Sequence, residues 1–258
     1  MRRVLHAGID VGSTTTKLVV TEKKTGKILY SSYVRHEAVQ IRSVCNCMKT
    51  LAKKFGRDEI RLVLTGSGSK ELADRLGLQY VQETVANSIA VRYLYGDMGT
   101  AIELGGQDAK IIFFQKDEKT GLLNVADMRM NGSCAGGTGA FIDEMAAVLK
   151  IPVEDFNEYA GRGKAVYDIS GRCGVYAKTD IQPLLNQGIA REDLALSAFH
   201  AIAKQTIGGL AQGLDIKGPV IFEGGPLNFN PVLVQVFAQR LELDEKDVIQ
   251  PENAKIMM

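Results

Sequence analysis

The sequence lacks an excess of charge of either sign, and it also lacks long hydrophobic runs. Its 31 lysines and arginines nearly match its 30 aspartates and glutamates, which gives a formal net charge of +1. A chain without a basic field or an acidic arm is not expected to bind nucleic acid. The apolar runs are too short for a transmembrane helix, and the first residues lead into a predicted strand without a signal-peptide pattern. We therefore expect a cytoplasmic protein with no membrane partner.

Histidine and cysteine are scarce. Three scattered histidines exclude a histidine-rich metal site. The four cysteines of a cytoplasmic protein are expected to be reduced, and therefore available for metal or redox chemistry rather than for disulfides. The remaining composition, 45% hydrophobic and 24% charged over 258 residues, is ordinary for a globular protein of one or two coupled domains.

Two segments of twelve residues, 9–20 and 102–113, share one sequence pattern. The offset of 93 residues (103 − 10 = 93) aligns Asp10 with Glu103 and Lys17 with Lys110. Each copy has an apolar strand that carries the acid, a Gly-containing turn, the lysine and a second apolar strand, which is typical of a β-hairpin. Because acid and lysine stay in register, a chance similarity between two hairpins is the minor alternative.

A weaker repeat follows each hairpin. Residues 62–68 and 220–226 both have the pattern of a buried strand that runs into glycines, and residues 141–149 and 194–214 have helical periodicity. The residues expected on one buried face of a further helix are Ile41, Val44, Cys45, Met48, Leu51, Ala52 and Phe55. The order hairpin, helix, strand, helix thus occurs twice. It predicts two α/β halves, residues 1–95 and 96–258, around a cleft.

The two turns have the composition of a polyphosphate site, since backbone N–H groups and hydroxyls can contact phosphate oxygens and glycines allow close approach. The residues expected to contact nucleotide are Gly12, Ser13, Thr14, Thr15 and Lys17 in the first turn and Gly105, Gly106 and Lys110 in the second. No Walker sequence or strand–GxGxxG–helix pattern offers an alternative phosphate site.

Four acidic or amide residues are candidates for catalysis. Asp10 and Glu103 are expected to hold Mg²⁺ through water, because Mg²⁺ retains much of its hydration shell. Gln107 or Asp108 is expected to orient the attacking water. Taken alone, Asp10 is equally well explained as a turn-capping residue and Lys17 as a solvated lysine. The duplication favours phosphate binding.

The cysteines form two unlike pairs. Cys45 and Cys47 lie two residues apart on a predicted helix and point in nearly opposite directions, so they are poor joint ligands; we expect Cys45 in the core and Cys47 on the surface. Cys134 and Cys173 each have a glycine within two residues on either side, and Cys134 precedes a helix expected to begin near Thr138, whose N-terminus favours a thiolate. Two cysteines cannot complete a four-thiolate cluster site, although a two-fold dimer would supply four. From spacing alone, two free buried thiols are the better interpretation.

Four segments together resemble the activators of 2-hydroxyacyl-CoA dehydratases, a family that includes the ATPase subunits of benzoyl-CoA reductase and the reductase of double-cubane-cluster proteins. These segments are residues 8–14, the Gly-Gly-Gln-Asp run at 105–108, the Cys-Ala-Gly-Gly-Thr-Gly run at 134–139 and the residues around Cys173. The resemblance covers essentially the whole chain. It implies an α/β protein of the actin/Hsp70/sugar-kinase fold, with two duplicated RNase H-like halves around a nucleotide cleft.

The resemblance also implies a function. It implies a homodimer with one [4Fe–4S] cluster shared between two subunits and held by Cys134 and Cys173 of each. It implies ATP or ADP with Mg²⁺, with Gly136, Gly137 and Thr138 near the phosphates and Gly224, Gly225 and Pro226 beside the adenosine. ATP hydrolysis would drive low-potential electrons, taken from ferredoxin or flavodoxin under anaerobic conditions, to an iron–sulfur acceptor enzyme of the dehydratase or reductase type.

The sequence departs from the family pattern at several positions. Glu103 stands where the family usually has Asp, and Asn87 stands where it has His. Residues 171–175, 180–183 and 222–227 are closer to the long, multi-domain members, and the family continues beyond Met258 into a Gly/Ala-rich helix, so we expect that a C-terminal piece is missing. Two other functions stay open: a small-molecule kinase, with Asp108 or Asp180 as base, and a non-redox interaction ATPase.

Overall fold

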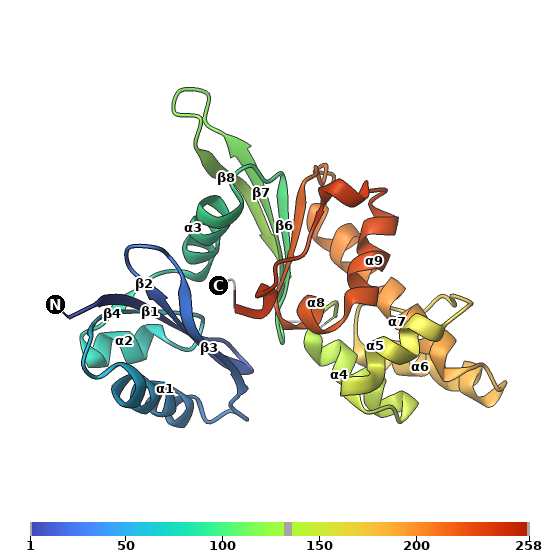
Figure 1. Cartoon of the computed structure of the whole chain (residues 1–258). Helices are drawn as coiled ribbons and strands as arrows, with labels where there is room; N and C mark the ends of the chain where they lie inside the picture. Colours follow the sequence, from blue (N-terminus) through green and yellow to red (C-terminus); the bar gives the residue numbers. More distant parts are fainter. Residues whose placement is uncertain (1, 132–135, 257–258) are drawn as a thin grey trace. The chain divides into compact units, whose positions relative to one another are not determined.

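The computed structural model describes residues 2–131 and 136–256, which form two compact units. One unit runs to Leu94 and includes Ile256, and the other spans Tyr95–Lys255. Each unit is built on its own five-stranded sheet (Figure 1). None of the described helices is long and apolar enough to cross a membrane.

The first sheet has the strand order β3-β2-β1-β4-β5. Its strands are β1 (Val4–Val11), β2 (Thr15–Glu22), β3 (Ile28–Arg35), β4 (Glu59–Thr65) and β5 (Gln79–Tyr80). The first three strands are antiparallel, whereas β4 pairs parallel with β1 and β5 pairs parallel with β4. Parallel neighbours require crossover connections, and these contain α1 (Gln40–Phe55) and α2 (Lys70–Leu76); α3 (Glu83–Tyr95) follows β5.

The second sheet, read as β8-β7-β6-β9-β10, has the same order. Its strands are β6 (Thr100–Leu104), β7 (Ala109–Lys116), β8 (Leu123–Met130), β9 (Val220–Glu223) and β10 (Val248–Ile249). Again the first three are antiparallel and the last two are parallel. The duplication inferred from two hairpins therefore extends to whole sheets. The third strands, β3 and β8, were not predicted from the sequence because these strands, which lie at the sheet edge and have half of their residues exposed, lack a clear apolar alternation.

The second unit has more helices than the first, contrary to the expectation of two equal plans. The described helices between β8 and β9 are α4 (Gly139–Leu149), α5 (Phe156–Arg162), α6 (Gly174–Asn186) and α7 (Arg191–Thr206), with a 3₁₀ turn at Val153–Asp155. At the corresponding place the first unit has α1 alone. The helix expected over 194–214 ends as an α-helix at Thr206 and continues as a π-helical turn, Ile207–Ala211, where Gly208 and Gly209 weaken α-helical preference. After β9 come α8 (Gly225–Phe229), α9 (Pro231–Arg240) and 3₁₀ turns at Glu245–Asp247 and Ala254–Ile256.

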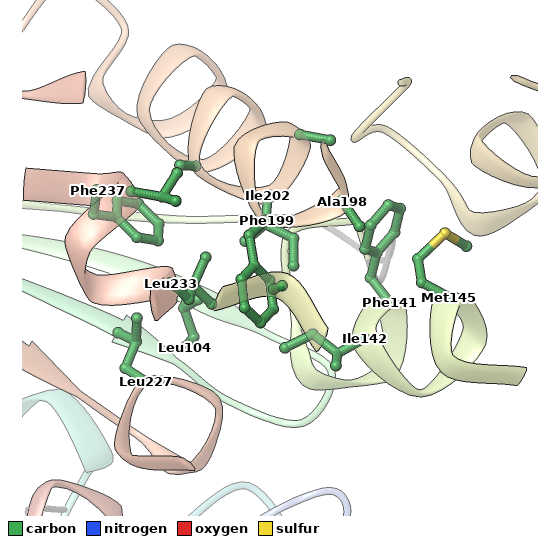
Figure 2. Close-up of a cluster of buried hydrophobic side chains, with 14 of the residues drawn as sticks. Leu104, Phe141, Ile142, Met145, Ala198, Phe199, Ile202, Leu227, Leu233 and Phe237 are labelled. Atoms are coloured by element: carbon green, nitrogen blue, oxygen red, sulfur yellow. The ribbon is translucent and has the colours of Figure 1, made fainter. Parts of the chain in front are cut away.

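Each unit has its own hydrophobic core. In the first, residues of β1, β2 and β4 pack against α1 and α2. In the second, β6 is buried along its whole length, as expected for a central strand covered on both faces. Figure 2 shows Phe199 of α7 among side chains from β6, α4, α8 and α9, and its ring centroid lies 5.3 Å from that of Phe156 on α5. This core fixes the helices that follow the second turn.

The prediction for the α1 cysteines was wrong. Cys45 is exposed and Cys47 is buried, the reverse of the expected arrangement, and Ile41 is 67% exposed. The buried stripe runs through Val44, Cys47 and Leu51, with a spacing of three and four residues. Each residue of an α-helix is rotated by about 100° from the one before, so Cys45 turns away from a stripe centred on Val44 and Cys47.

Candidate functional site

The first turn connects β1 to β2 and is closed by a hydrogen bond from the N–H of Gly12 to the carbonyl of Thr15, at 2.9 Å. Directly behind it, Asp10 and Lys17 are opposite one another in the antiparallel register. Lys17 Nζ lies 2.7 Å from Asp10 Oδ2, and both side chains are buried. Ser13 is exposed and Thr14 is half-buried, so the hydroxyl-bearing tip of the turn is the part that a ligand can reach.

The second turn, between β6 and β7, repeats this geometry. The N–H of Gly105 donates to the carbonyl of Asp108 at 2.7 Å, and Lys110 Nζ lies 3.1 Å from Glu103 Oε2. Lys110 Nζ also lies 2.9 Å from Oδ2 of Asp108, the residue that aligns with Thr15 of the first turn. The first turn thus presents hydroxyl groups, whereas the second presents an acid and the exposed amide of Gln107.

A glycine packs against each hairpin from the neighbouring parallel strand. Gly66 follows β4 with φ +95°, and Gly224 follows β9 with φ +92°. A Cβ atom at Gly66 would collide with Asp10 and with the Val11 carbonyl, and one at Gly224 would collide with the carbonyl of Leu104, which aligns with Val11. Both positions require glycine for the same reasons, close approach and positive φ. The weaker repeat at 62–68 and 220–226 therefore corresponds to equivalent places in the two sheets.

The second turn is hydrogen-bonded to the start of α4. The N–H groups of Gly139 and Ala140 donate to the carbonyls of Gly105 and Gly106, at 2.9 and 2.8 Å. The first N–H groups of a helix have no partner within the helix, so these bonds tie the helix N-terminus to the turn. Thr138 is the N-cap residue of α4, which confirms the prediction that a helix begins near it, and it is fully buried. Gly139 also faces Pro226, at 3.1 Å from a Cβ built on it, which brings the turn after β9 to the same place.

The described residue that comes nearest in sequence after Cys134, Gly136, packs against the two residues before Cys173. Residues 132–135, and Cys134 with them, are outside the described part of the chain. Gly136, however, packs so closely on the backbone of Gly171 and Arg172 that a Cβ would collide with both carbonyls. Cys173 is half-buried and is the N-cap residue of α6. The described residues contain no cluster of three or more His, Cys, Asp or Glu side chains that could hold a metal ion.

The stretch before Cys173, residues 163–172, is held by side chains rather than by strand pairing. Asp193 Oδ1 accepts from the N–H of Lys164 and of Ala165, and Ser197 Oγ accepts from the N–H of Tyr167. Asp180 Oδ2 accepts from the N–H of Ser170 at 2.9 Å. Asp180, which the sequence offered as a base for a kinase, thus has a structural contact with this stretch.

Glu223 is a residue that sequence reasoning missed. It is fully buried at the end of β9 and stands beside Glu103 in the parallel register, where the first unit has Thr65 beside Asp10. Its charge reaches Tyr95, whose pKa is raised by burial and then by Glu223 and Glu252. The signal was available in the weaker repeat, where Glu223 of residues 220–226 aligns with Thr65 of residues 62–68.

Gly225 and Pro226, expected beside the adenosine, begin the short helix α8. Proline is favoured in the first turn of a helix because a backbone N–H at that position would have no partner within the helix, so its absence costs no hydrogen bond. Gly224 is the residue before this helix. The three residues therefore form a strand-to-helix junction at the end of β9.

The duplicated sheets, each with a glycine-containing turn and a glycine after the parallel strand, have the actin/Hsp70/sugar-kinase fold. The activator of 2-hydroxyisocaproyl-CoA dehydratase from Clostridium difficile, solved with bound ADPNP, has the same fold with a TM-score of 0.81, at 23% identity, over 98% of this chain and 90% of that chain.

Residues 7–250 match the BadF/BadG/BcrA/BcrD ATPase family, and the chain belongs to this family. It is 29% identical to the (R)-2-hydroxyglutaryl-CoA dehydratase activating ATPase of Acidaminococcus fermentans over 84% of this chain and 81% of that protein. It is 26% identical to the 2-hydroxyisocaproyl-CoA dehydratase activator of Clostridioides difficile over 92% and 86%. The family resemblance inferred from the motifs is thereby confirmed.

Proposed function

We propose that this ATPase is a [4Fe–4S] electron-transfer activator, which passes low-potential electrons to a partner iron–sulfur enzyme such as a 2-hydroxyacyl-CoA dehydratase. Two relatives are named as activators of such dehydratases. The observation that carries the proposal is the short connection between the second turn and Cys173. It runs from the carbonyls of Gly105 and Gly106 through the start of α4 to Gly136, which packs against the residues before Cys173.

Each turn is proposed to contact phosphate groups of ATP. Backbone N–H groups and the hydroxyls of Ser13, Thr14 and Thr15 would contact phosphate oxygens. Asp10 and Glu103 would accept hydrogen bonds from water bound to Mg²⁺. This fits the buried Oδ1 of Asp10, which has no hydrogen-bond partner among the described residues.

Hydrolysis needs a group that holds the attacking water. Asp108 is fixed by its contact with Lys110, and its side chain is 36% exposed. A carboxylate that is both oriented and accessible suits the positioning of water. Gln107, at the exposed tip of the second turn, is the other candidate.

Cys173 suits a cluster ligand in three respects. It is half-buried rather than sealed, it is followed by glycine, and it stands at the N-terminus of the 13-residue helix α6. The partial positive charge there favours a thiolate and a negatively charged cluster, by about 0.3–1 kcal/mol. A bound cluster would supply one-electron transfer at low potential. Cys134 is proposed as the second ligand.

A homodimer would bring two such cysteine pairs together to complete four thiolates. The first turn of α6 supports this, because Val175 and Tyr176, two and three residues after Cys173, are 72% and 65% exposed. Exposed apolar side chains beside a site are a common mark of an interaction surface. We propose that this turn faces the second subunit.

Anaerobic purification of four single Cys→Ser variants tests the cluster. Cys134→Ser and Cys173→Ser should lose iron, whereas Cys45→Ser and Cys47→Ser should retain about four irons per dimer, the content of one [4Fe–4S] centre. Iron per chain and oligomeric state are both measured. Four irons per chain, or full iron in Cys173→Ser, would refute the shared cluster and leave an ATPase without it.

A second experiment tests the connection to the turn. Ala140→Pro removes the N–H that donates to Gly106, yet proline is tolerated in the first turn of a helix. Ala140→Ser keeps this N–H and is the matched control. In wild type, replacing ADP by ATP should change the rate at which a chelator removes iron, and Ala140→Pro should abolish that difference. Retention of the nucleotide effect in Ala140→Pro would show that these hydrogen bonds do not transmit it.

The phosphate role of the first turn is tested by isothermal titration of ATP. Lys17→Ala and Thr14→Ala should weaken binding, and Asp10→Asn and Glu103→Gln should retain binding but slow hydrolysis. Unchanged affinity in Lys17→Ala would remove its proposed phosphate role. Wild-type hydrolysis in either acid variant would exclude that acid from the Mg²⁺ site.

A further inference from the structure

His36 has a buried side chain, and the proposed ATP-binding and cluster-binding roles do not involve it. It follows β3 directly, is 6% exposed, and lies against the first turn. Its Nε2 is 3.0 Å from the carbonyl oxygen of Gly12, and its backbone N–H donates to the carbonyl of Thr14 at 3.1 Å. One residue thus contacts the turn on both sides of Ser13.

The contact defines the state of the imidazole. A carbonyl oxygen only accepts hydrogen bonds, so Nε2 carries the proton and donates to Gly12. Nδ1 is buried and has no hydrogen-bond partner among the described residues. Burial of an unpaired ring nitrogen is unfavourable for folding. Folding stability alone therefore does not account for a buried histidine here, whereas the hydrogen bond from its Nε2 to Gly12 does.

The backbone next to His36 is strained in the same place. Glu37 and Ala38 have φ of +47° and +64°, a region that residues with a Cβ rarely enter, and here two do so in succession. The N–H of Val39 closes this loop on the carbonyl of His36 at 2.7 Å. Gln40, the first residue of α1, adds a second side-chain donor toward Gly12, with its amide Nε2 at 3.4 Å from the carbonyl oxygen.

We propose that His36 is a positioning residue for nucleotide, which aims the N–H of Ser13 at a phosphate oxygen by holding the carbonyl of Gly12. The Gly12 carbonyl and the Ser13 N–H belong to one trans peptide plane and point in opposite directions. Fixing the carbonyl toward His36 fixes the N–H away from it. This inference rests on the proposed ATP-binding function of the first turn.

The corresponding brace in the second unit is different in kind. There Asn131 follows β8, and its side-chain oxygen accepts from the N–H of Ala109 at 2.9 Å while its backbone N–H donates to the carbonyl of Ala109. It holds the start of β7 rather than the carbonyl of the turn glycine. The imidazole contact is thus a feature of the hydroxyl-bearing turn, where backbone N–H groups are the main proposed phosphate donors.

The test compares His36→Ala, His36→Gln and a matched control, His6→Ala, which removes an exposed histidine of β1 in the same sheet. His36→Ala should raise KM and Kd for ATP about tenfold, the equivalent of one lost hydrogen bond. Its kcat should fall much less, because the catalytic groups stay in place. His36→Gln keeps an amide donor and should recover part of the affinity, and His6→Ala should match wild type.

A measurement on the wild-type chain keeps the proposal testable if His36→Ala fails to fold. Long-range ¹H–¹⁵N NMR correlations distinguish the two imidazole tautomers, and His36 should be protonated at Nε2. A proton on Nδ1 alone would overturn the brace, as would ATP affinity in His36→Ala equal to that of wild type. Failure of wild type to bind ATP would instead refute the proposed function of the turn.

Discussion

At the scale of single residues, the repeated chemical unit is a buried acid and lysine in cross-strand register. Asp10 with Lys17, and Glu103 with Lys110, have the same positions in two hairpins and the same close contact. Burying a charge is unfavourable unless it is paired. Removing one partner of either pair leaves an uncompensated buried charge, so substitutions at these lysines need a stability readout as well as an ATP-binding readout.

Lys17→Met should destabilise the chain by roughly 3–5 kcal/mol, because it leaves the buried carboxylate of Asp10 without its partner. Urea denaturation provides the measurement. The control is Lys23→Met, which replaces an exposed lysine in the loop after β2 and should change stability by less than about 0.5 kcal/mol. The double variant Asp10→Leu with Lys17→Met should be more stable than Lys17→Met. Equal stability of Lys17→Met and wild type would mean that the pair is not coupled to folding.

The two cysteines of α1 should differ in reactivity toward iodoacetamide. Burial raises the pKa of the Cys47 thiol above its ordinary value of 9.0, which lowers the fraction of reactive thiolate, and also shields the sulfur. Cys45 is exposed. Mass spectrometry of native protein should find alkylated Cys45 and unmodified Cys47, with both modified in urea. Equal labelling of both in native protein would contradict the buried stripe.

At the scale of elements, residues 163–172 form a connection that depends on a few side-chain acceptors. The carboxylate of Asp193 accepts hydrogen bonds from two backbone N–H groups. The bond from Lys164 lowers the pKa of Asp193 most, followed by the bond from Ala165. This stretch leads to Cys173, so its anchors also set where the proposed ligand lies. Polar side chains here accept hydrogen bonds from backbone N–H groups that a neighbouring strand would satisfy in a sheet.

Asp193→Ala should loosen this connection. Amide hydrogen exchange at Lys164 and Ala165 should accelerate at neutral pH, and stability should fall slightly. A lowered folded-state pKa gives stabilisation that is present above the unfolded value, near 3.8, and that is lost as the pH falls through the folded value. The stability difference between wild type and Asp193→Ala should therefore shrink below about pH 4. A difference that stays constant from pH 6 to pH 3 would contradict a role for the ionised carboxylate.

Also at this scale, the sequence predicted the elements whose residues have a repeated pattern. The acid, glycine and lysine positions predicted both hairpins, and Thr138 marked the start of α4. The edge strands β3 and β8 have no such pattern and were not predicted. The mutual approach of Gly136 and Gly171 depends on packing between segments distant in the chain, which periodicity does not encode. The predicted orientation of α1 was wrong for a related reason. Two overlapping apolar stripes fit its sequence, and tertiary packing determines which of them is buried.

At the scale of the whole molecule, two hydrophobic cores serve two sheets. The first core draws on residues up to Tyr80, and the second on residues from Ile102 onward. The second is larger because α4, α5, α7 and α9 all contribute to it. The helices that follow the two proposed cluster cysteines, α4 and α6, therefore both pack in the second core.

Phe199→Ala should destabilise that core by roughly 3–5 kcal/mol, because it removes a fully buried ring among tightly packed neighbours. Native-state hydrogen exchange resolves the effect by region. Amides of β6, such as Leu104, should lose protection, whereas those of β2, such as Leu18, should retain it. Equal loss in both sheets would mean that the two units unfold together. Leu122→Ala, at an exposed residue before β8, is the control and should change neither.

The carboxylates behind the turns have a consequence for electroneutrality. In the first turn the charges of Asp10 and Lys17 cancel, and in the second Glu103 and Asp108 outweigh Lys110 by one. Turns of this composition add no net positive charge to balance a polyphosphate, and dipoles of backbone N–H groups compensate only part of it. A divalent counter-ion would then be a condition of binding as well as of hydrolysis. Such a protein would respond to the concentration of free divalent cation as directly as to that of the nucleotide itself.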